Sequence, residues 1–403
     1  MPSSQPVSTP QPAPTQLCEA LGSGSFGIVF RAIQPSGHVI AVKKSRVPLR
    51  FSRPGLQHEA RILHLLQGHK TIPELWGYHR GPHYEYIGME LLGHNLKSKV
   101  PWQEADVGLR PETVLRIGIQ LLSALEHLES KGVVHRDIKP TNVLLSAQDP
   151  SSVVLIDFGI SSLRNVHRPQ PKSPPIIGSL EWCSIHVHAK RWPLCAADDL
   201  ESLIYTLLFC VSCWLPWSTD IASIWDPLAV AGIAHAKKTF TGTTLVGVEC
   251  PLTAALGRLL DEARALPIDG VPQYAHIAAG LSAALPACAS PSAPLDFTPI
   301  PLPTVLKRRF ASANIPFSHP DQLQIPPPED DGPFRDSNST CGQYDWFLQH
   351  DRAADLTFPV DDAQVCDAAL STMPFHVDYR VPKCPIQHRG WKEIMPESEI
   401  YGP

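Results

Sequence analysis

The sequence predicts an α+β fold in two lobes, a small β-rich N-terminal lobe with one helix and a larger, mostly helical C-terminal lobe. Two observations support this prediction. In the first part of the chain, short β-branched and aromatic runs alternate with turns, and a single pattern of helical period interrupts them, at residues 56–66. Further along, the apolar patterns are longer and have the character of helices, at residues 111–130, 200–215 and 251–285.

Shifts in composition set the expected boundaries. The first residues are rich in Pro, Ser, Thr and Gln, a composition typical of disorder. Near the end, Pro is dense, periodicity is lost, and the few aromatic residues cannot build an independent core. That tail could pack onto the preceding lobes or bind a partner. We expect a disordered N-terminus at 1–14, the first lobe at 15–93, the second at 94–285, and a Pro-rich, largely irregular tail at 286–403.

Composition also bounds the function. The 403 residues are 43% hydrophobic and carry a net charge of -5. The chain has no excess of basic residues, so its charge does not indicate binding to nucleic acid or to an anionic membrane. Cys210 and Cys213 form a C-x-x-C in an apolar helical run, which favours core packing over zinc. The N-terminus has no signal-peptide pattern, and residues 203–215 are too short for a bilayer span. We expect a monomeric cytoplasmic protein with reduced thiols; the nucleus is a second possible location.

A glycine-rich turn follows the first predicted strand, at residues 16–21. Residues 22–27 read GSGSFG, and three glycines at this spacing let the backbone approach phosphate oxygens closely. A dinucleotide-binding turn has the same glycines but opens into a helix. Here residues 28–32 are β-branched and aromatic, and a Pro-Ser-Gly turn leads to another strand at 39–43. The sequence therefore predicts a hairpin over phosphates.

The second strand of this hairpin ends in a candidate phosphate-binding lysine. Alternation along the strand places Ala41 and Lys43 on one face and Lys44 on the other, where we expect a solvated side chain. A lysine beside the glycine turn would pair with the α- and β-phosphates of a nucleotide. Glu59 lies beside the apolar stripe of the helix at 56–66 and is the expected partner of Lys43; a surface glutamate is the alternative.

Further elements follow in order. Strands are expected at 74–79 and 84–91, and Gly93 reads as the start of a hinge. The helix at 111–130 begins with proline, which suits a first turn, and is followed by Lys131-Gly132, which suits a C-terminus.

Residues 134–142 read VHRDIKPTN and supply a carboxylate, a cation and an amide on a predicted loop. The apolar run at 153–156 then ends in Asp157-Phe158-Gly159. Asp137 would accept a proton from a hydroxyl group, while Asn142 and Asp157 would hold Mg²⁺ on phosphate. This spacing is typical of the phosphoryl-transfer site of a protein kinase; the alternative is a surface turn with a chance acid and amide.

The rest of the chain is expected to be a long loop at 160–184 followed by helices. Asp198-Asp199 are the predicted N-cap of a helix with an apolar body at 200–215. Two helices joined by a turn at Pro267 then end the second lobe.

With these motifs in place, residues 15–285 resemble the casein kinase 1 group of Ser/Thr protein kinases. Five stretches carry the resemblance beyond general kinase motifs. They are GSGSFG at 22–27, GHKTIP at 68–73, MELLG at 89–93, GSLEWCSI at 178–185 and DDLESL at 198–203.

The resemblance implies a two-lobed protein kinase fold, ATP and Mg²⁺ as cofactors, and Ser/Thr residues of proteins as substrates. It makes Met89 a gatekeeper and brings the backbone of Glu90 and Leu92 to adenine. The nucleotide-binding positions that it implies are Leu21, Gly22, Ser23, Gly24, Ser25, Phe26, Gly27, Val29, Ala41, Lys43, Glu59, Met89, Glu90, Leu92, Leu144 and Asp157.

The catalytic positions that the resemblance implies are Asp137 as base, Lys139 as the cation that stabilises the transferring phosphoryl group, and Asn142, which holds Mg²⁺ with Asp157. Ser179 would bridge Asp137 and Lys139, and Asp199 would brace the backbone of the catalytic loop.

The sequence also departs from the family. Ala196-Ala197 stand where the family has an Arg-Arg pair for acidic or phosphorylated substrates; Lys237 and Lys238 could supply charge, but without the guanidinium fork. Glu181-Trp182 replace Arg-Tyr, which would make the substrate groove more acidic. We therefore expect no preference for primed substrates.

An arginine at position 136 receives an activation-loop phosphate in many kinases, and Ser173 is the candidate loop site; the family generally works without such activation, so basal activity is expected. A catalytically weak scaffold is the alternative to an active enzyme.

Overall fold

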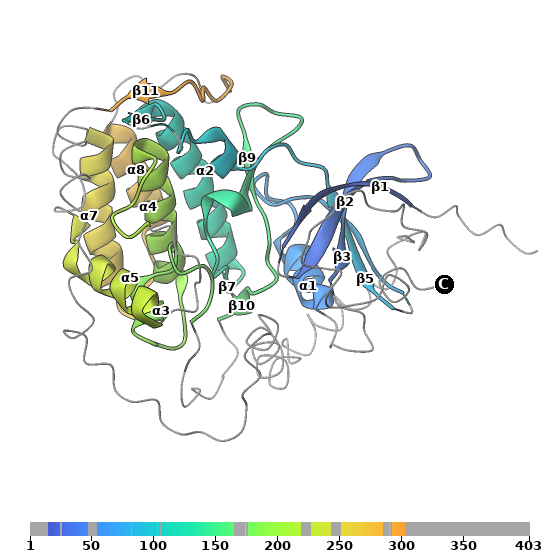
Figure 1. Ribbon diagram of the computed structural model, residues 1–403, viewed down its shortest axis with the longest axis horizontal. Coiled ribbons are helices and arrows are strands. Elements are labelled where there is room, and N and C mark those ends of the chain that lie inside the picture. Colours follow the sequence, from blue (N-terminus) through green and yellow to red (C-terminus); the bar gives the residue numbers. More distant parts are fainter. Residues whose placement is uncertain are drawn as a thin grey trace, which may run out of the picture. The chain divides into compact units, whose positions relative to one another are not determined.

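The computed structural model in Figure 1 describes residues 15–302 except for 25, 47–54, 82, 103, 105, 165–173, 175, 219–226, 243–250, 285–289 and 291. The described residues form two compact units. The first contains residues 15–64 and 74–91, and the second contains residues 65–73 and 92–302. Ser25, Ser173, the predicted N-terminus 1–14 and most of the predicted tail lie outside the described residues.

The first unit is an antiparallel five-stranded sheet with one helix, in the strand order β1-β2-β3-β5-β4. The elements are β1 (Gln16–Ser23), β2 (Gly27–Ile33), β3 (Val39–Ser45), α1 (Leu56–Leu66), β4 (Leu75–Arg80) and β5 (Glu85–Glu90). α1 has the bounds predicted from its apolar period. β2 and β3 pair antiparallel on either side of the Pro-Ser-Gly turn, so the predicted hairpin is present. The glycine-rich turn that precedes it joins β1 and β2.

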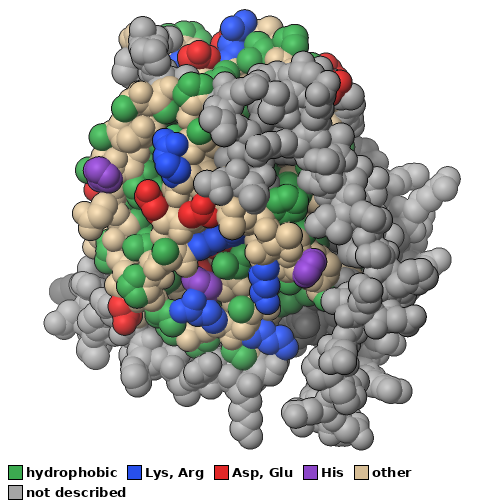
Figure 2. Space-filling view, turned by 90° about the vertical axis from the view of Figure 1, so that its left-hand side faces the viewer, with side chains coloured by type: hydrophobic (Ala, Val, Ile, Leu, Met, Phe, Trp, Pro, Cys, Tyr) green, Lys and Arg blue, Asp and Glu red, His purple; other side chains and the backbone are tan. Residues whose placement is uncertain are grey.

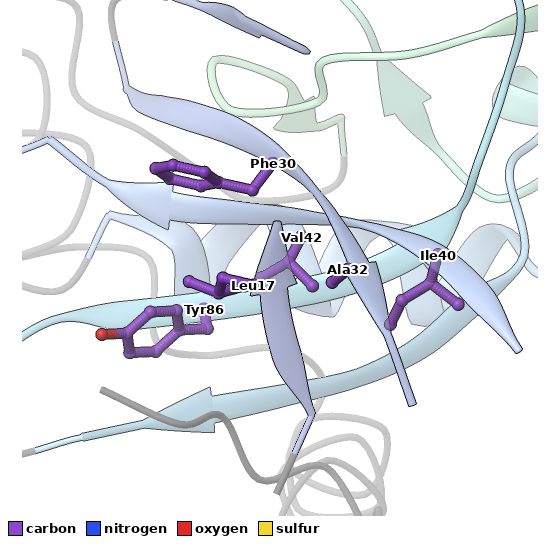
Figure 3. Packing of buried hydrophobic residues seen from close by; sticks show 6 residues of the cluster. All are labelled: Leu17, Phe30, Ala32, Ile40, Val42 and Tyr86. Carbon is purple, nitrogen blue, oxygen red and sulfur yellow. The ribbon is translucent and has the colours of Figure 1, made fainter. Parts of the chain in front are cut away.

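The sheet carries its apolar core and its lysine site on opposite faces. Phe30 pairs with Val42, and the next pair along is Val29 with Lys43, so Phe30 and Val42 point away from the face of Lys43. Figure 3 shows the apolar face, where six side chains with at most 4% exposure pack together: Leu17, Phe30, Ala32, Ile40, Val42 and Tyr86. This burial fixes the register of β3 and hence the side on which Lys43 lies.

The prediction of a solvated Lys44 is wrong. Lys44 is only partly exposed, and its Nζ lies 3.9 Å from the centroid of the Tyr84 ring. Burial lowers the pKa of Lys44 to about 8. Alternation along β3 was read correctly, but the face on which Lys44 lies carries aromatic residues, and they cover the lysine.

The second unit is mostly helical (Figure 1). Its elements are η1 (Leu96–Lys99), β6 (Val107–Gly108), α2 (Pro111–Ser130), β7 (Val133–Val134), η2 (Pro140–Asn142), β8 (Val143–Leu145), β9 (Val153–Leu155), β10 (Ser162–Leu163), α3 (Ile185–His188), α4 (Ala196–Ser212), α5 (Pro227–Thr239), α7 (Pro251–Ala265), α8 (Tyr274–Ala283) and β11 (Ile300–Pro301). All residues of α4 are buried, so this helix is the centre of the unit. No helix in the described part of the chain has the length and apolar character needed to cross a membrane.

The N-terminus of α4 differs from the prediction. Cys195 is the N-cap, and Asp198 is the third residue of the first turn, where its carboxylate accepts a hydrogen bond from the Cys195 N–H at 2.7 Å. The alanines at 196 and 197 extend the helix by about half a turn beyond its predicted start. Asp198 is therefore not the N-cap residue but a first-turn residue whose side chain caps the Cys195 N–H. At the other end, Cys213 has a left-handed backbone with φ 58° and ends the helix. Cys210 and Cys213 are buried and unpaired, as predicted.

The first described residues of the predicted tail pack onto α2. The Thr113 hydroxyl donates to the Asp296 carbonyl at 2.7 Å, and the Arg116 guanidinium donates to the Pro294 carbonyl at 3.2 Å. β11 pairs antiparallel with β6. Neither strand has a sequence signal, because each is two residues long and forms only when the partner is present.

Candidate active site

A buried ion pair links the sheet of the first unit to its helix. β3 presents Lys43 on the face toward α1, and its Nζ donates to the two carboxylate oxygens of Glu59 at 2.9 and 2.7 Å. Both side chains are buried, so the charges attract strongly while each offsets the desolvation of the other. The ion pair expected from the sequence is therefore present, and it holds the ammonium group in one position.

The glycine-rich turn lies at the end of the hairpin of β1 and β2, closed by a hydrogen bond from Gly24 N–H to Gly27 O at 2.8 Å. A Cβ atom on Gly27 would lie 2.4 Å from the Lys44 carbonyl oxygen, so packing requires this glycine. A Cβ atom on Gly22 or Gly24 would have no atom of the described residues within 4 Å, and neither residue has a left-handed backbone. Protein packing does not explain these two glycines, whereas close approach of a ligand would.

The other predicted nucleotide-binding residues are divided between the two units, and most of those in the first unit lie on its strands. Ala41 and Met89 are paired neighbours on β3 and β5, and both are buried. Leu21 is exposed on β1. The remaining described positions are Ser23, Phe26, Val29 and Glu90 in the first unit and Leu92 and Leu144 in the second, where Leu144 forms a bridge with Asn95.

In the second unit, three polar side chains meet around the carboxylate of Asp137. Lys139 Nζ donates to Oδ2 at 2.6 Å, and Asn142 Nδ2 donates to the same oxygen at 3.1 Å and to the Asp137 carbonyl at 2.9 Å. The Ser179 hydroxyl donates to Oδ1 at 2.9 Å and accepts from Lys139 Nζ at 2.8 Å. The structure thus brings together the residues that the sequence placed 42 positions apart, and Ser179 bridges Asp137 and Lys139 as predicted.

The backbone of the catalytic loop is held by Asp199 of α4. Its carboxylate accepts from the N–H groups of His135 at 2.6 Å and Arg136 at 2.8 Å, as predicted. Burial raises the pKa of Asp199 to about 7, and the two backbone donors oppose that rise. Arg136 has a left-handed backbone with φ 71°, a conformation uncommon outside glycine that persists only where the surroundings determine it.

The Arg136 side chain is engaged with backbone carbonyls. It is buried, and its guanidinium donates to Ile160 O at 2.5 Å and to Ser161 O at 3.4 Å. The Arg136 guanidinium, which receives an activation-loop phosphate in many kinases, is therefore hydrogen-bonded to the backbone at the start of the predicted loop at 160–184.

Gly178 allows Ser179 to reach the catalytic loop. Its φ is +80°, and a Cβ atom there would lie 2.4 Å from the Arg136 carbonyl oxygen. Both the backbone conformation and the close approach require glycine. The predicted Gly-Ser step is therefore a fixed part of the site.

Asn142 and Asp157 offer oxygen ligands for a cation. The N–H of Ile156 donates to the Asn142 carbonyl at 2.9 Å, which joins the two residues through paired strands β8 and β9. Because the Asn142 side-chain nitrogen faces Asp137, its amide oxygen points elsewhere. Asp157 has a left-handed φ of 68°. Among the described residues no group of three or more His, Cys, Asp or Glu could hold a metal, but Mg²⁺ at phosphate sites needs only one or two protein ligands.

Comparison with known proteins agrees with these features. A family model described as the protein kinase domain matches residues 15–186. This part of the chain is thus similar to a protein kinase domain. The chain is also 27% identical over 268 residues to the casein kinase I homolog RAG8 of Kluyveromyces lactis, a match that covers 64% of this chain and 48% of the relative. The chain thus spans about half the length of that relative, and the predicted likeness to casein kinase 1 is confirmed.

A solved structure gives the fold. The structure of vaccinia related kinase 3 superimposes with a TM-score of 0.55 at 23% identity, and the match covers 70% of this chain and 90% of the other. Together with the sheet of the first unit and the helices of the second, this confirms the predicted α+β protein kinase fold.

The structure corrects the role predicted for Lys237. Lys237 is fully buried, so it cannot supply charge to a substrate. Trp182 is buried too, with its ring 5.3 Å from that of Phe209, and the Glu181 carboxylate accepts a hydrogen bond from Ser218. The sequence prediction failed because it placed no helix at α5 and so gave Lys237 no packed environment.

Proposed function

We propose that this chain is a Ser/Thr protein kinase that transfers the γ-phosphoryl group of Mg-ATP to hydroxyl groups of proteins. One observation carries the proposal: the Asp137 carboxylate is held jointly by Lys139, Asn142 and Ser179 at 2.6–3.1 Å. Such an arrangement fixes both the carboxylate that would accept the proton of the attacking hydroxyl and the ammonium that would face the transferred phosphoryl group.

The residues also fit the cofactors. Gly22 and Gly24 leave room that no atom of the described residues fills. The Lys43 ammonium is fixed by Glu59, which suits pairing with the α- and β-phosphates. Asn142 and Asp157 would hold Mg²⁺, whose charge would offset that of the phosphates when it is bound. ATP and Mg²⁺ are what protein kinase domains use in general.

The proposal is tested by the rate of phosphoryl transfer to Ser-containing peptides in the Asp137→Asn variant. Asparagine keeps the shape and one acceptor oxygen but is not a base, so kcat should fall by about 10²- to 10⁴-fold. Asp149→Asn is the matched control: the Asp149 carboxylate accepts hydrogen bonds from Ser151 and Ser152, its neighbours in sequence, and the rate should not change. Equal rates for wild type and Asp137→Asn would refute Asp137 as the base.

A catalytically weak scaffold is the competing function. It predicts that wild type binds Mg-ATP but transfers no phosphate, and that Asp137→Asn changes nothing. The contacts that hold Asp137 favour the enzyme, because a scaffold that only binds Mg-ATP has no need for a fixed carboxylate and ammonium at the site of transfer.

We further propose that the enzyme does not prefer phosphate-primed peptides. Ala196 and Ala197 are buried at the start of α4, and Lys237 is enclosed in the second unit. Lys238 is exposed, and Figure 2 shows Lys and Arg side chains at several separate places on one side of the molecule. Separate point charges lack the paired geometry of two guanidinium groups.

This second proposal is tested with peptides that differ only in an upstream Ser or phospho-Ser. Their kcat/KM values should agree within about twofold. A single charge-assisted hydrogen bond to the phosphate would raise kcat/KM by more than this. A gain of about tenfold or more for the phosphorylated peptide would contradict it.

A further inference from the structure

The ammonium group of Lys237 lies inside the second unit. Its side chain, on α5, has no exposed surface. Nζ donates to Leu180 O at 2.7 Å and to Cys183 O at 2.6 Å, and it lies 3.3 Å from Nε2 of His188. Burying an ammonium costs free energy that only well-placed hydrogen bonds offset. The contacts of Lys237 are with carbonyl oxygens and a ring nitrogen, so the charge is used to fix a segment of backbone.

The surroundings suit an ammonium without a carboxylate in contact. Nζ lies 5.1 Å from the centroid of the Tyr205 ring and 5.5 Å from that of Trp217, and aromatic faces attract cations. Burial, and then the charge of Lys237, lower the pKa of His188 to about 3, so this ring is neutral. Burial also lowers the pKa of Lys237 itself, while Cys183 and Glu201 oppose that change.

The segment that Lys237 holds begins at the catalytic cluster. The N–H groups of Trp182 and Cys183 both donate to Ser179 O at 2.9 Å, so residues 179–183 form one tight turn. At its start, the Ser179 N–H and hydroxyl donate to Asp137 Oδ1 at 3.1 and 2.9 Å. The carbonyls of Leu180 and Cys183, in the same turn, accept from Lys237. The turn is thus bound to the catalytic loop at one end and to α5 at the other.

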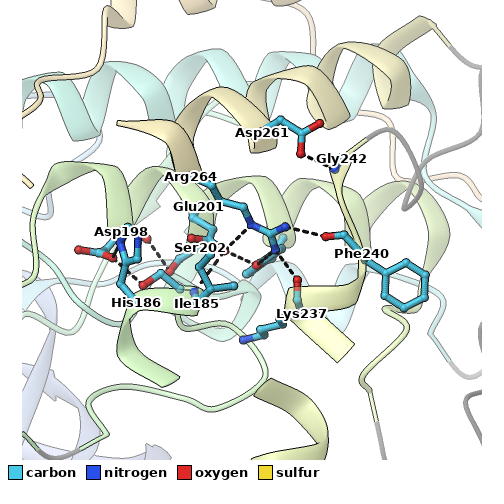
Figure 4. Close-up of polar contacts among 12 residues, drawn as sticks. Ile185, His186, Asp198, Glu201, Ser202, Lys237, Phe240, Gly242, Asp261 and Arg264 are labelled. Atoms are coloured by element: carbon cyan, nitrogen blue, oxygen red, sulfur yellow. Dashed lines mark hydrogen bonds and ion pairs between the residues drawn. The ribbon is translucent and has the colours of Figure 1, made fainter. Parts of the chain in front are cut away.

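A second, partly buried cation fixes the end of α5. Arg264 of α7 donates to Lys237 O at 3.0 Å and to Phe240 O at 2.6 Å, and its Nε lies 3.0 Å from Oε1 of Glu201 on α4. That oxygen also accepts from the N–H of Ile185 at 3.3 Å. Figure 4 shows these contacts converging on the Arg264 guanidinium. The Lys237 backbone therefore has a fixed position relative to α4 and α3.

We propose that Lys237 is a positioning residue for phosphoryl transfer, which holds Ser179 against Asp137 and Lys139 through the carbonyls of Leu180 and Cys183. This proposal rests on the kinase function proposed above. Lys237 has no route to substrate because it has no exposed surface, so it acts only through the turn at 179–183.

The test is a double-mutant cycle between Lys237→Met and Ser179→Ala, measured as kcat on a peptide without acidic residues. Methionine fills a similar volume but leaves the Leu180 and Cys183 carbonyls without their donor, so kcat should fall by about ten- to hundredfold. If Lys237 acts through Ser179, the double variant should be no slower than the slower single variant. Lys238→Met, the exposed neighbour, is the control and should retain the wild-type rate.

A second readout does not depend on activity. Amide hydrogen exchange of residues 179–183 should accelerate by about tenfold or more in Lys237→Met and stay unchanged in Lys238→Met. If circular dichroism shows that Lys237→Met does not fold, kcat and amide exchange would be measured on Lys237→Gln instead. Its amide group keeps an N–H donor, so we expect smaller changes of the same sign.

The outcomes separate the two proposals. Faster exchange at 179–183 in a protein that transfers no phosphate would reject the kinase function, and with it the catalytic role of Lys237. Unchanged exchange with normal turnover in Lys237→Met would overturn the positioning role alone. Effects of Lys237→Met and Ser179→Ala that multiply would also overturn it, because independent residues give additive free energies.

Discussion

Two buried lysines, one in each compact unit, are held in different ways. Lys43 faces the carboxylate of Glu59 across 16 positions of sequence, whereas Lys237 faces backbone carbonyls 54 and 57 positions away. The first arrangement depends on one hairpin and one helix, each with a strong sequence pattern. The second depends on four helices that meet only in the folded unit. A buried ammonium paired with a carboxylate is suited to receive a ligand's negative charge, and one paired with carbonyls is suited to hold backbone.

The largest predicted effect concerns Lys43. Lys43→Met leaves the Glu59 carboxylate buried without its ammonium partner, so the free energy of unfolding should fall by about 3–5 kcal/mol, and turnover should be lost with it. Urea unfolding followed by fluorescence measures this, and Lys44→Met, on the other face of the same strand, is the matched control. An equal decrease in the free energy of unfolding in the two variants would show that the Lys43–Glu59 ion pair does not contribute to stability beyond the burial of a lysine side chain.

The second prediction compares glycines of similar backbone geometry in the two units. Gly37 and Gly178 have φ values of +86° and +80°, but a Cβ atom would have no atom within 4 Å at Gly37 and would lie 2.4 Å from Arg136 O at Gly178. Gly37→Ala should cost only the left-handed conformation, about 1 kcal/mol. Gly178→Ala should cost about 1–3 kcal/mol more from the clash, and kcat should fall because Ser179 is displaced.

Thermal and urea unfolding of the two glycine variants, together with their kcat values, would check this. A Gly178→Ala variant as stable and as fast as Gly37→Ala would mean that the catalytic loop yields easily, contrary to the fixed geometry around Asp137.

The smallest predicted effect is a pH dependence in the first unit. Burial lowers the pKa of Lys44 from 10.5 to about 8, so between these values the unfolded chain binds more protons at this position than the folded one. Stability contributed by this site should therefore rise as the pH increases from about 8 to 10.5. The difference in melting temperature between wild type and Lys44→Met should shift in favour of wild type over this range, and a constant difference would show that the Tyr84 ring offsets burial.

The sequence predicted two long helices and the motif residues most completely. α1 and α2 were predicted to the residue, because their apolar periods are long and their ends carry clear signals. Asp137, Lys139, Asn142 and Ser179 were also predicted, from motif spacing and from the resemblance to casein kinase 1, and the structure brings them within hydrogen-bond distance.

What the sequence did not show depends on tertiary contacts. Lys237 was read as an exposed charge, since a Lys-Lys pair in a weakly periodic stretch gives no sign that one of the two is enclosed. β6 and β11 pair across 192 positions with two residues each, and no local pattern marks so short a strand. The start of α4 was misplaced because two alanines without a polar cap look like the end of a loop.

The central claim is that this chain transfers phosphate to Ser and Thr hydroxyls. The most direct measurement is incubation of the full chain with Mg-ATP and a peptide mixture with Ser, Thr or Tyr as the only acceptor, followed by mass spectrometry. The account predicts phosphate on the Ser and Thr peptides, dependent on Mg²⁺ and lost in Asp137→Asn, with the Tyr peptides unmodified. Tightly bound Mg-ATP with no phosphate on any peptide would contradict it and assign the chain to a scaffold role.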